Sequence, residues 1–166
     1  GEIQLVQVEY VQGGKAGERD PDPDGPLPWR YDPVLGGPSL VLGDIGTHAH
    51  NLVRFVTGRE VDQVAADIGN IVANRLVDDY AGALLRFDNG ARGSFWVTQA
   101  ATGVENCLRI RVSGTRGTVE ALRLTSEGTL ESVGSAATGD DGTYSLQSLI
   151  PGTYKVRYSS TGYQTV

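Results

Sequence analysis

The sequence lacks the features that mark several classes of protein. Its single cysteine, Cys107, excludes an internal disulfide framework. No apolar run approaches the roughly 20 residues that a membrane-spanning helix needs, and the N-terminus has no basic-then-apolar signal pattern. The net charge of −6 argues against a nucleic-acid partner, because phosphate contacts require a basic surface. We therefore expect neither a membrane nor a nucleic acid as a partner.

Methionine is absent altogether, and the chain passes from Gly1 directly into a strand-like stretch, EIQLVQVEY. For these two reasons we expect an excerpt of a longer protein or an engineered chain. The length of 166 residues suits one medium domain, or one domain with a small added module. The hydrophobic fraction of 39% is ordinary for a globular chain.

The first third of the chain predicts a strand, a long loop and a helix. Apolar and polar residues alternate over 1–12, which is typical of a half-buried strand. Residues 13–33 are rich in Gly, Pro and Asp and predict a loop long enough to be functional or disordered. From about Ser39 to Thr57 apolar residues recur at near-helical spacing, and Gly58 follows as a helix stop.

The middle of the chain changes to a period of two residues. This pattern predicts one strand over 59–73 and two hairpins, 81–87 with 93–101 and 107–114 with 117–124. In the first hairpin, a three-residue loop over 88–90 with Gly90 in the left-handed region gives the register that puts apolar residues on one face. The alternation of Cys107 with Arg109 and Arg111 also indicates a strand position.

The two faces of the predicted sheet differ in character. The face expected to lie under the helix carries Leu85, Phe87, Phe95, Val97, Leu108, Ile110 and Val112. The opposite face carries Leu84, Arg86, Ser94, Trp96, Arg109 and Arg111. Trp and Arg are enriched at protein interfaces, so this second face predicts a contact with a partner. The alternative is that Trp96 lies beneath the tail or beneath arginine stems.

The composition changes again after Leu124, where Ser, Thr, Gly and Tyr become frequent. We place a boundary between about Ala121 and Ser132, which gives a main domain of residues 1–124 and a β-rich appendage of residues 125–166. The predicted fold class is α+β: an open, mostly antiparallel sheet with one main helix on one face, plus this small appendage.

The stretch GDIGTHAHNL, from Gly43 to Leu52, contains both histidines of the chain beside an aspartate. Asp44 and His48 have a spacing of four, so on a helix they share a face, whereas His50 points elsewhere. Three interpretations are open. The stretch is a metal site completed by a remote carboxylate, a helix start that Asp44 caps, or an acid–base pair in which Asp44 orients the His48 imidazole.

A longer stretch, WRYDPVLGGPSLVLGDIGTHAHNLVRFVTG over residues 29–58, resembles the substrate-domain signature of the glucose–fructose oxidoreductase / inositol dehydrogenase / MocA family. The shared features are Trp-Arg, a glycine pair, and Asp-Ile-Gly-x-His opening a helix. The fragments LLRFDNGARGSF and TGVENCLRIRVSGTRGTVE also resemble the family and follow in the family's order. The resemblance covers about residues 1–122.

The resemblance implies a role for each residue of this stretch. His48 is the general base that takes a proton from a substrate hydroxyl, and Asp44 orients it or binds the substrate. Trp29 and Arg30 lie at the pocket wall, although a hydrophobic plug and a solvated loop cation are equally open interpretations. Asn51 stands where the family commonly has Asp, and it is expected to contact a sugar or polyol substrate.

Other parts of the family's active site have no counterpart here. The family binds NAD or NADP through a glycine-rich turn in an N-terminal Rossmann domain, and no G-x-G-x-x-G occurs in this sequence. The family's catalytic lysine is absent as well, since Lys15 and Lys155 stand in unrelated contexts. We therefore expect this chain alone to bind no cofactor and no metal. The predicted function is the substrate-binding half of an NAD(P)-dependent sugar or polyol oxidoreductase.

The tail, TGDDGTYSLQSLIPGTYKVRYSSTGYQTV, resembles a different family, the carboxypeptidase-regulatory-like or collagen-adhesin B-type modules. That resemblance implies extracellular modules, whereas the main domain's resemblance implies the cytoplasm. The alternative function is therefore a structural, assembly or adhesion fragment without catalysis, and an artificial or misjoined chimera is one origin of such a chain. The resemblance to the oxidoreductase family also implies pairing through the face of the sheet away from the helix. We therefore expect a homodimer through Arg86, Trp96, Arg109 and Arg111.

Overall fold

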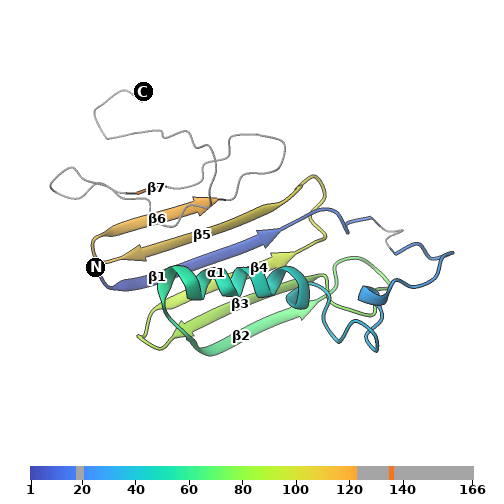
Figure 1. Ribbon diagram of the computed structural model, residues 1–166, viewed down its shortest axis with the longest axis horizontal. Helices are drawn as coiled ribbons and strands as arrows, with labels where there is room; N and C mark the ends of the chain where they lie inside the picture. Colours follow the sequence, from blue (N-terminus) through green and yellow to red (C-terminus); the bar gives the residue numbers. More distant parts are fainter. Residues whose placement is uncertain (18–20, 123–134, 137–166) are drawn as a thin grey trace, which may run out of the picture.

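The computed structural model describes residues 1–17, 21–122 and 135–136. These residues form an open sheet in the order β2-β3-β4-β1-β5-β6-β7, with helix α1 lying across one face (Figure 1). Every neighbouring pair is antiparallel except β1 and β4, which are parallel. The predicted α+β class, with an open and mostly antiparallel sheet, is confirmed. The strands are β1 (Ile3–Val11), β2 (Val61–Gly69), β3 (Tyr80–Phe87), β4 (Arg92–Thr98), β5 (Cys107–Gly114), β6 (Gly117–Leu122) and β7 (Ser135–Ala136).

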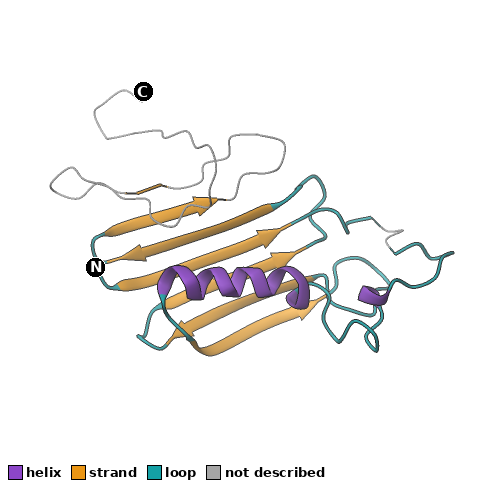
Figure 2. Cartoon of the chain, in the orientation of Figure 1, coloured by secondary structure: helices purple, strands orange, loops and turns teal. Residues whose placement is uncertain are grey.

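Among the residues that the structure describes, three helical segments accompany the sheet. Figure 2 shows the helical residues in purple. The segments are a short 3₁₀ turn η1 (Trp29–Tyr31), a π-helical turn η2 (Leu42–Gly46) and the main helix α1 (Thr47–Thr57). The predicted helix over residues 39–57 is therefore real but begins later. Gly58 ends it in the left-handed conformation, with φ of 62°, and its amide donates to the Arg54 carbonyl, as the sequence predicted.

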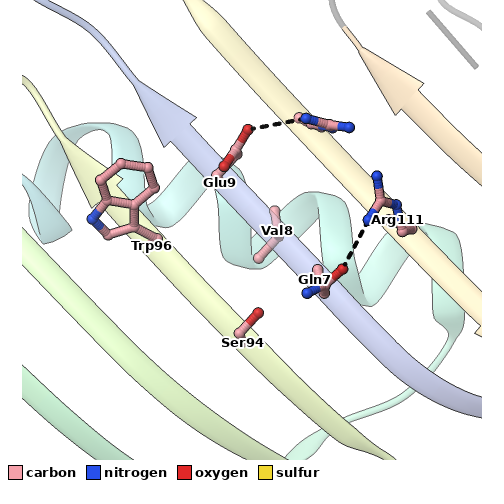
Figure 3. Close-up of a pocket in the computed structure, with 7 residues that line it drawn as sticks. Gln7, Val8, Glu9, Ser94, Trp96 and Arg111 are labelled. Atoms are coloured by element: carbon pink, nitrogen blue, oxygen red, sulfur yellow. Dashed lines mark hydrogen bonds and ion pairs between the residues drawn. The ribbon is translucent and has the colours of Figure 1, made fainter. Parts of the chain in front are cut away.

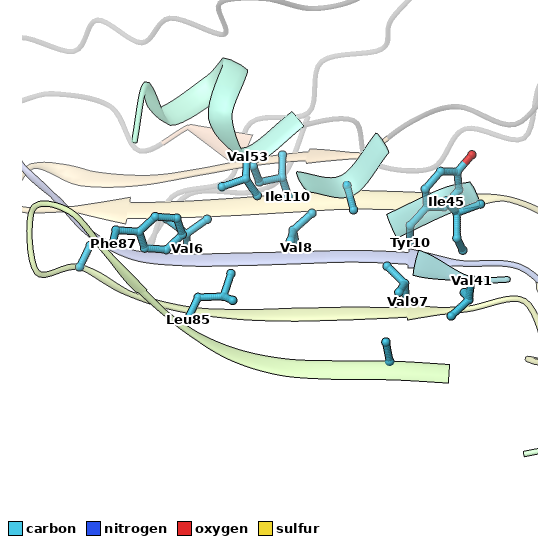
Figure 4. Close-up of a cluster of buried hydrophobic side chains, with 13 residues drawn as sticks. Val6, Val8, Tyr10, Val41, Ile45, Val53, Leu85, Phe87, Val97 and Ile110 are labelled. Carbon is cyan, nitrogen blue, oxygen red and sulfur yellow. The ribbon is translucent and has the colours of Figure 1, made fainter. Parts of the chain in front are cut away.

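The core lies between α1 and the centre of the sheet (Figure 4). Ala49 and Val53 of α1 are 0% and 1% exposed and pack against β1 and β5. The predicted covered face is confirmed. Its most buried members are Leu85, Phe87, Val97 and Ile110, and its partly buried members are Phe95, Leu108 and Val112. Burial of these apolar side chains is the main favourable term that holds the helix to the sheet.

The first hairpin has the predicted loop. The amide of Phe87 donates to the carbonyl of Ala91 at 3.0 Å, which leaves residues 88–90 as a three-residue loop. Gly90 has a φ of 84°, a conformation that costs other residues more than glycine. Arg86 therefore pairs with Arg92, and the two strands present their apolar residues to the same side.

Two of the predicted strands end at least three residues earlier than expected. β2 ends at Gly69 instead of continuing to Ala73, because the carboxylate of Asp79 accepts the amides of Ile71 and Val72 and turns the chain. β4 ends at Thr98 instead of Ala101. For β2, the hydrogen bonds that end the strand come from a residue remote from Gly69 in the local pattern.

The proposed boundary near residue 124 and the appendage of residues 125–166 lie outside the described residues, apart from β7, which pairs with β6. Within the described part of the chain, no helix combines the length and apolar character that crossing a bilayer requires.

Candidate functional site

The strongest candidate site lies beyond the carboxyl ends of the parallel neighbours β1 and β4. There the η1 loop, the η2 turn and the residues after β4 meet. A cavity of about 160 Å³ opens between them. Its lining residues are Trp29, Arg30, Gly36, Ser39, Leu40, Gly43 and Asp44. Three of the residues singled out from the sequence, Trp29, Arg30 and Asp44, are thus brought to one cavity.

Asp44 is the centre of the polar contacts in this cavity. Its Oδ2 accepts a hydrogen bond from Arg30 Nη1 at 3.2 Å and another from Gln99 Nε2 at 3.2 Å. The side chains of Arg30 and Asp44 are 48% and 30% exposed, so the pair is reachable from solvent. The Arg30 guanidinium also lies 5.2 Å from the centre of the Trp29 ring. A carboxylate beside a guanidinium suits the recognition of hydroxyl groups, which both donate and accept hydrogen bonds.

The η1 loop is fixed from beneath by Tyr31, which the sequence analysis did not single out. Tyr31 is 4% exposed and packs with Leu40 and Val77 in a small second core. Lys15 and Arg75 place their cationic groups 5.2 Å and 5.6 Å from its ring. Burial of one aromatic ring therefore holds the neighbouring Trp29 and Arg30 at the surface.

The glycine pair of the motif has a steric reason. A Cβ on Gly36 would lie 2.5 Å from the carbonyl oxygen of Trp29, which no side chain can tolerate. The Gly36 amide also donates to the Asp32 carbonyl at 2.7 Å, closing the turn that faces the cavity. Gly37 has a φ of 87°, the left-handed region that favours glycine.

Asp44 does not cap the helix, so that interpretation of the sequence is wrong. The amides at the start of the helical segment are satisfied by two other residues. Ser39 Oγ accepts the amides of Leu42 and Gly43, and Asp78 Oδ2 accepts the amides of Val41 and Leu42. The Ser39 hydroxyl donates to Asp78 in turn, at 3.1 Å. This arrangement leaves the Asp44 carboxylate available for the cavity.

His48 lies on the first turn of α1 and is exposed. Its ring meets the ring of Tyr10 edge-on, with 6.4 Å between centres. Among the described residues, no hydrogen bond or ion pair joins it to Asp44, whose carboxylate faces Arg30 and Gln99. His50 and Asn51 are also exposed on α1, and none of these three α1 residues lines the cavity. Joint action of Asp44 and His48 on a substrate remains a prediction.

A buried polar cluster beneath the site was missed by the sequence analysis. Arg75, Asp78 and Asp79 are all buried although all three are charged residue types. The available signal was the run NRLVDDY, in which two adjacent acids follow apolar residues at the end of a strand pattern. Across the residues that the structure describes, no group of three or more His, Cys, Asp or Glu side chains is placed to hold a metal ion.

We call the face of the sheet away from α1 the open face. It carries a second hollow, of about 280 Å³ (Figure 3). Gln7, Glu9, Ser94, Trp96, Arg109 and Arg111 line it together with Val8. The two arginines are paired within the sheet: Arg109 contacts Glu9 and Glu120, and Arg111 contacts Glu120 at 3.1 Å. The glutamates come from neighbouring strands, so the sequence alone did not reveal that the arginine charges are compensated.

Comparisons with known proteins agree with one another. A sequence model of one family, described as the GFO/IDH/MocA C-terminal domain, matches residues 1–120. An uncharacterized oxidoreductase of Bacillus subtilis, YfiI, is 30% identical over 122 residues, which are 72% of this chain and 31% of that protein. The levoglucosan dehydrogenase of Pseudarthrobacter phenanthrenivorans is 31% identical over 142 residues, covering 72% of this chain and 35% of that protein.

Solved structures give the same result. An oxidoreductase domain protein from Kribbella flavida is 35% identical with a TM-score of 0.64, over 74% of this chain and 33% of the other. An inositol dehydrogenase homolog from Azotobacter vinelandii, complexed with NAD⁺, is 27% identical with a TM-score of 0.66, over 82% of this chain and 36% of the other. The chain therefore spans about a third of the length of the proteins it matches.

Proposed function

The chain belongs to the GFO/IDH/MocA C-terminal domain family, and from this premise we propose that it forms the substrate-binding half of an NAD(P)-dependent oxidoreductase of sugars or polyols. The observation that carries the proposal is the Asp44 carboxylate on the wall of a cavity, with Arg30 at 3.2 Å. Both of its hydrogen bonds end on Oδ2. Among the described residues Oδ1 accepts no hydrogen bond, so it is the oxygen available to a substrate hydroxyl.

Two residues have different roles in the proposed chemistry. The Asp44 carboxylate accepts a hydrogen bond from one hydroxyl and so orients the sugar ring. An imidazole nitrogen of His48 accepts the proton that the neighbouring hydroxyl loses when its carbon is oxidised. Asn51 follows His48 at a spacing of three on α1, so it lies on the same side of the helix. Its amide can bind a further hydroxyl.

The residues of this chain do not fit the nicotinamide dinucleotide. A pyrophosphate requires unoccupied backbone amides at a helix start. Here the amides at the start of the helical segment are bonded to Ser39 and to the negatively charged Asp78. The Asp44 carboxylate beside them would repel a phosphate. The proposal therefore assigns cofactor binding to residues outside this chain, in keeping with the greater length of its relatives.

We infer the class of substrate from the compounds that the names of the relatives mention. One relative is a levoglucosan dehydrogenase, with solved complexes containing NADH and levoglucosan or L-sorbose, and another is an inositol dehydrogenase homolog. Levoglucosan, L-sorbose and inositol all carry several hydroxyl groups. A cavity whose polar wall offers a carboxylate oxygen and a guanidinium is suited to this class.

The test is a titration of the chain with levoglucosan and, separately, with inositol, followed by amide shifts in NMR spectra. We expect binding with a Kd of about 1 mM or weaker, because a small polar ligand gains little free energy from an open half-site. The shifts should concentrate at Arg30, Gly43 and Asp44. Asp44→Asn and His48→Gln should weaken binding, whereas His50→Gln, the matched control, should not. Shifts scattered over the surface, or none, would favour a structural fragment without catalysis.

We also propose that a second copy of the chain packs against the open face. Trp96 is 42% exposed there, and Leu84 and Leu5 are 69% and 53% exposed on the same side. A two-fold interface brings identical patches together, so a patch of uncompensated arginines would repel its copy. Because Glu9 and Glu120 neutralise Arg109 and Arg111, that repulsion is reduced. Arg86 lies at the exposed margin of this face.

A further inference from the structure

The residue immediately after β4, Gln99, connects the candidate site to the interior. It is only 4% exposed. Its Nε2 donates to Asp44 Oδ2 at 3.2 Å and to Gln12 Oε1 at 3.1 Å. Gln12 Nε2 donates in turn to Asn106 Oδ1 at 2.9 Å. A row of amides therefore runs from the loop before β5, past the end of β1, to the carboxylate of the cavity.

The direction of these hydrogen bonds is determined by Asp44. An ionised carboxylate only accepts hydrogen bonds, so the group of Gln99 that faces it must be the NH₂ group. The same NH₂ group then requires an acceptor on Gln12, which turns the Gln12 amide toward Asn106. The orientation of every amide in the row thus follows from the negative charge at its end.

The position of the Gln99 side chain includes one energetically unfavourable feature. Its Oε1 is buried and has no hydrogen-bond partner among the described residues. A buried acceptor without a partner is unfavourable and uncommon, and such an atom calls for an explanation. The main chain of Gln99 is fixed on both sides, so the side chain starts from a well-defined position. Its amide donates to the Asp79 carbonyl at 3.3 Å, and its carbonyl accepts the Lys15 amide at 2.9 Å.

The other partner of Asp44 is less constrained. Arg30 belongs to a surface loop, and its side chain is 48% exposed. Exposed ion pairs contribute little to a fixed geometry because water and salt screen them and long side chains move. A hydrogen bond from a buried amide to a charged acceptor is screened less by water and salt, because the amide lies in a low-dielectric interior. Of the two contacts to Asp44, the one from the buried Gln99 amide therefore restricts the carboxylate more than the one from Arg30.

We propose that Gln99 is the positioning residue of the site: it holds the Asp44 carboxylate in one rotamer, with Oδ2 bound and Oδ1 directed to a substrate hydroxyl. The effect of this positioning on catalysis rests on the proposed function, since the rotamer matters for catalysis only if Asp44 binds substrate. The positioning itself does not depend on which substrate is bound. Gln99 touches no ligand, because its side chain is buried behind Asp44.

The experiment measures the Asp44 rotamer directly in the 166-residue chain. Three-bond couplings from Asp44 Cγ to its own backbone nitrogen and carbonyl carbon report the χ1 populations. We expect one rotamer in the wild-type chain and an average over rotamers in Gln99→Met. Arg30→Met should keep the single rotamer. Gln63→Met makes the same chemical change on exposed strand β2 and serves as the matched control.

The outcomes separate this proposal from the proposed function. Rotamer averaging in Gln99→Met, with levoglucosan or inositol binding weakened about tenfold, supports both. Averaging in a chain that binds neither compound supports the positioning role and rejects the proposed function. A single rotamer in Gln99→Met overturns the positioning role whatever the binding data show. If Gln99→Met does not fold, Gln99→Asn replaces it, because its amide is one methylene too short to reach Asp44 and the same averaging is expected.

Discussion

Arg75 Nη1 and Asp79 Oδ2 form a salt bridge of 2.8 Å, and the two side chains are 1% and 0% exposed. Arg75 also donates to the Lys15 carbonyl, and the Asp79 carbonyl accepts the Gln99 amide and the Thr98 hydroxyl. This ion pair therefore joins the loop after β1, the loop before β3 and the end of β4. Those three segments meet beneath the candidate site.

Asp79→Ala should lower the free energy of unfolding by about 3–5 kcal/mol, because it removes the carboxylate that forms a buried salt bridge with Arg75. The amides of Ile71 and Val72 lose their acceptor as well. Urea denaturation measures the change. The control is Arg59→Ala, which breaks an exposed pair with Asp88 of 3.9 Å and should cost about 1 kcal/mol or less. Equal losses in both variants would contradict the structural role given to Asp79.

Ser39→Ala should cost about 1 kcal/mol, the usual loss when a side chain that caps a helical segment is removed. Leu42 and Gly43 lose the hydroxyl that accepts their amides, and Asp78 loses a donor. Ser94→Ala on the open face should change stability by less than about 0.5 kcal/mol. Thermal unfolding of the two variants compares them. A Ser39→Ala chain as stable as the wild type would mean that Asp78 alone is sufficient to cap this segment.

Gly36→Ala should destabilise the chain by about 1–3 kcal/mol, since the new methyl group would collide with the Trp29 carbonyl. The collision should also displace Trp29, so its indole NH signal should move in the NMR spectrum. At Gly14 a Cβ would meet no atom within 4 Å, and Gly14→Ala is the matched control. An unmoved indole signal in Gly36→Ala would show that the η1 loop adapts without disturbing the cavity.

Trp96→Glu should convert the proposed dimer to a monomer without unfolding it, because Trp96 lies on the open face and contributes nothing to the core beneath α1. Phe55→Glu is the control: Phe55 is 72% exposed on α1, on the other side of the sheet, and should leave the dimer intact. Light scattering on a size-exclusion column at tens of micromolar gives the mass. A monomeric wild-type chain would rule the dimer out at that concentration.

Local patterns in the sequence were sufficient to predict much of the sheet. Alternation with a period of two assigned Leu85, Phe87, Val97 and Ile110 to the covered face, and the need to keep that face consistent selected the three-residue loop that ends at Gly90. Side chains on a strand alternate between faces by geometry alone, so this information is present in each strand separately. The position of Gly58 as a helix stop is local in the same sense.

The tertiary structure decided which polar groups meet. Asp44 is bonded to Arg30 and Gln99, which are remote from it in the chain, and Asp78 caps a helical segment that begins far earlier in the sequence. Likewise, Asp79 ends a strand that the local pattern would continue. Burial removes water as a partner, so each of these groups must find a partner that the folded topology brings close. No periodicity along the chain records that choice, and for this reason the roles of Gln99, Asp78 and Asp79 emerged only from the three-dimensional arrangement.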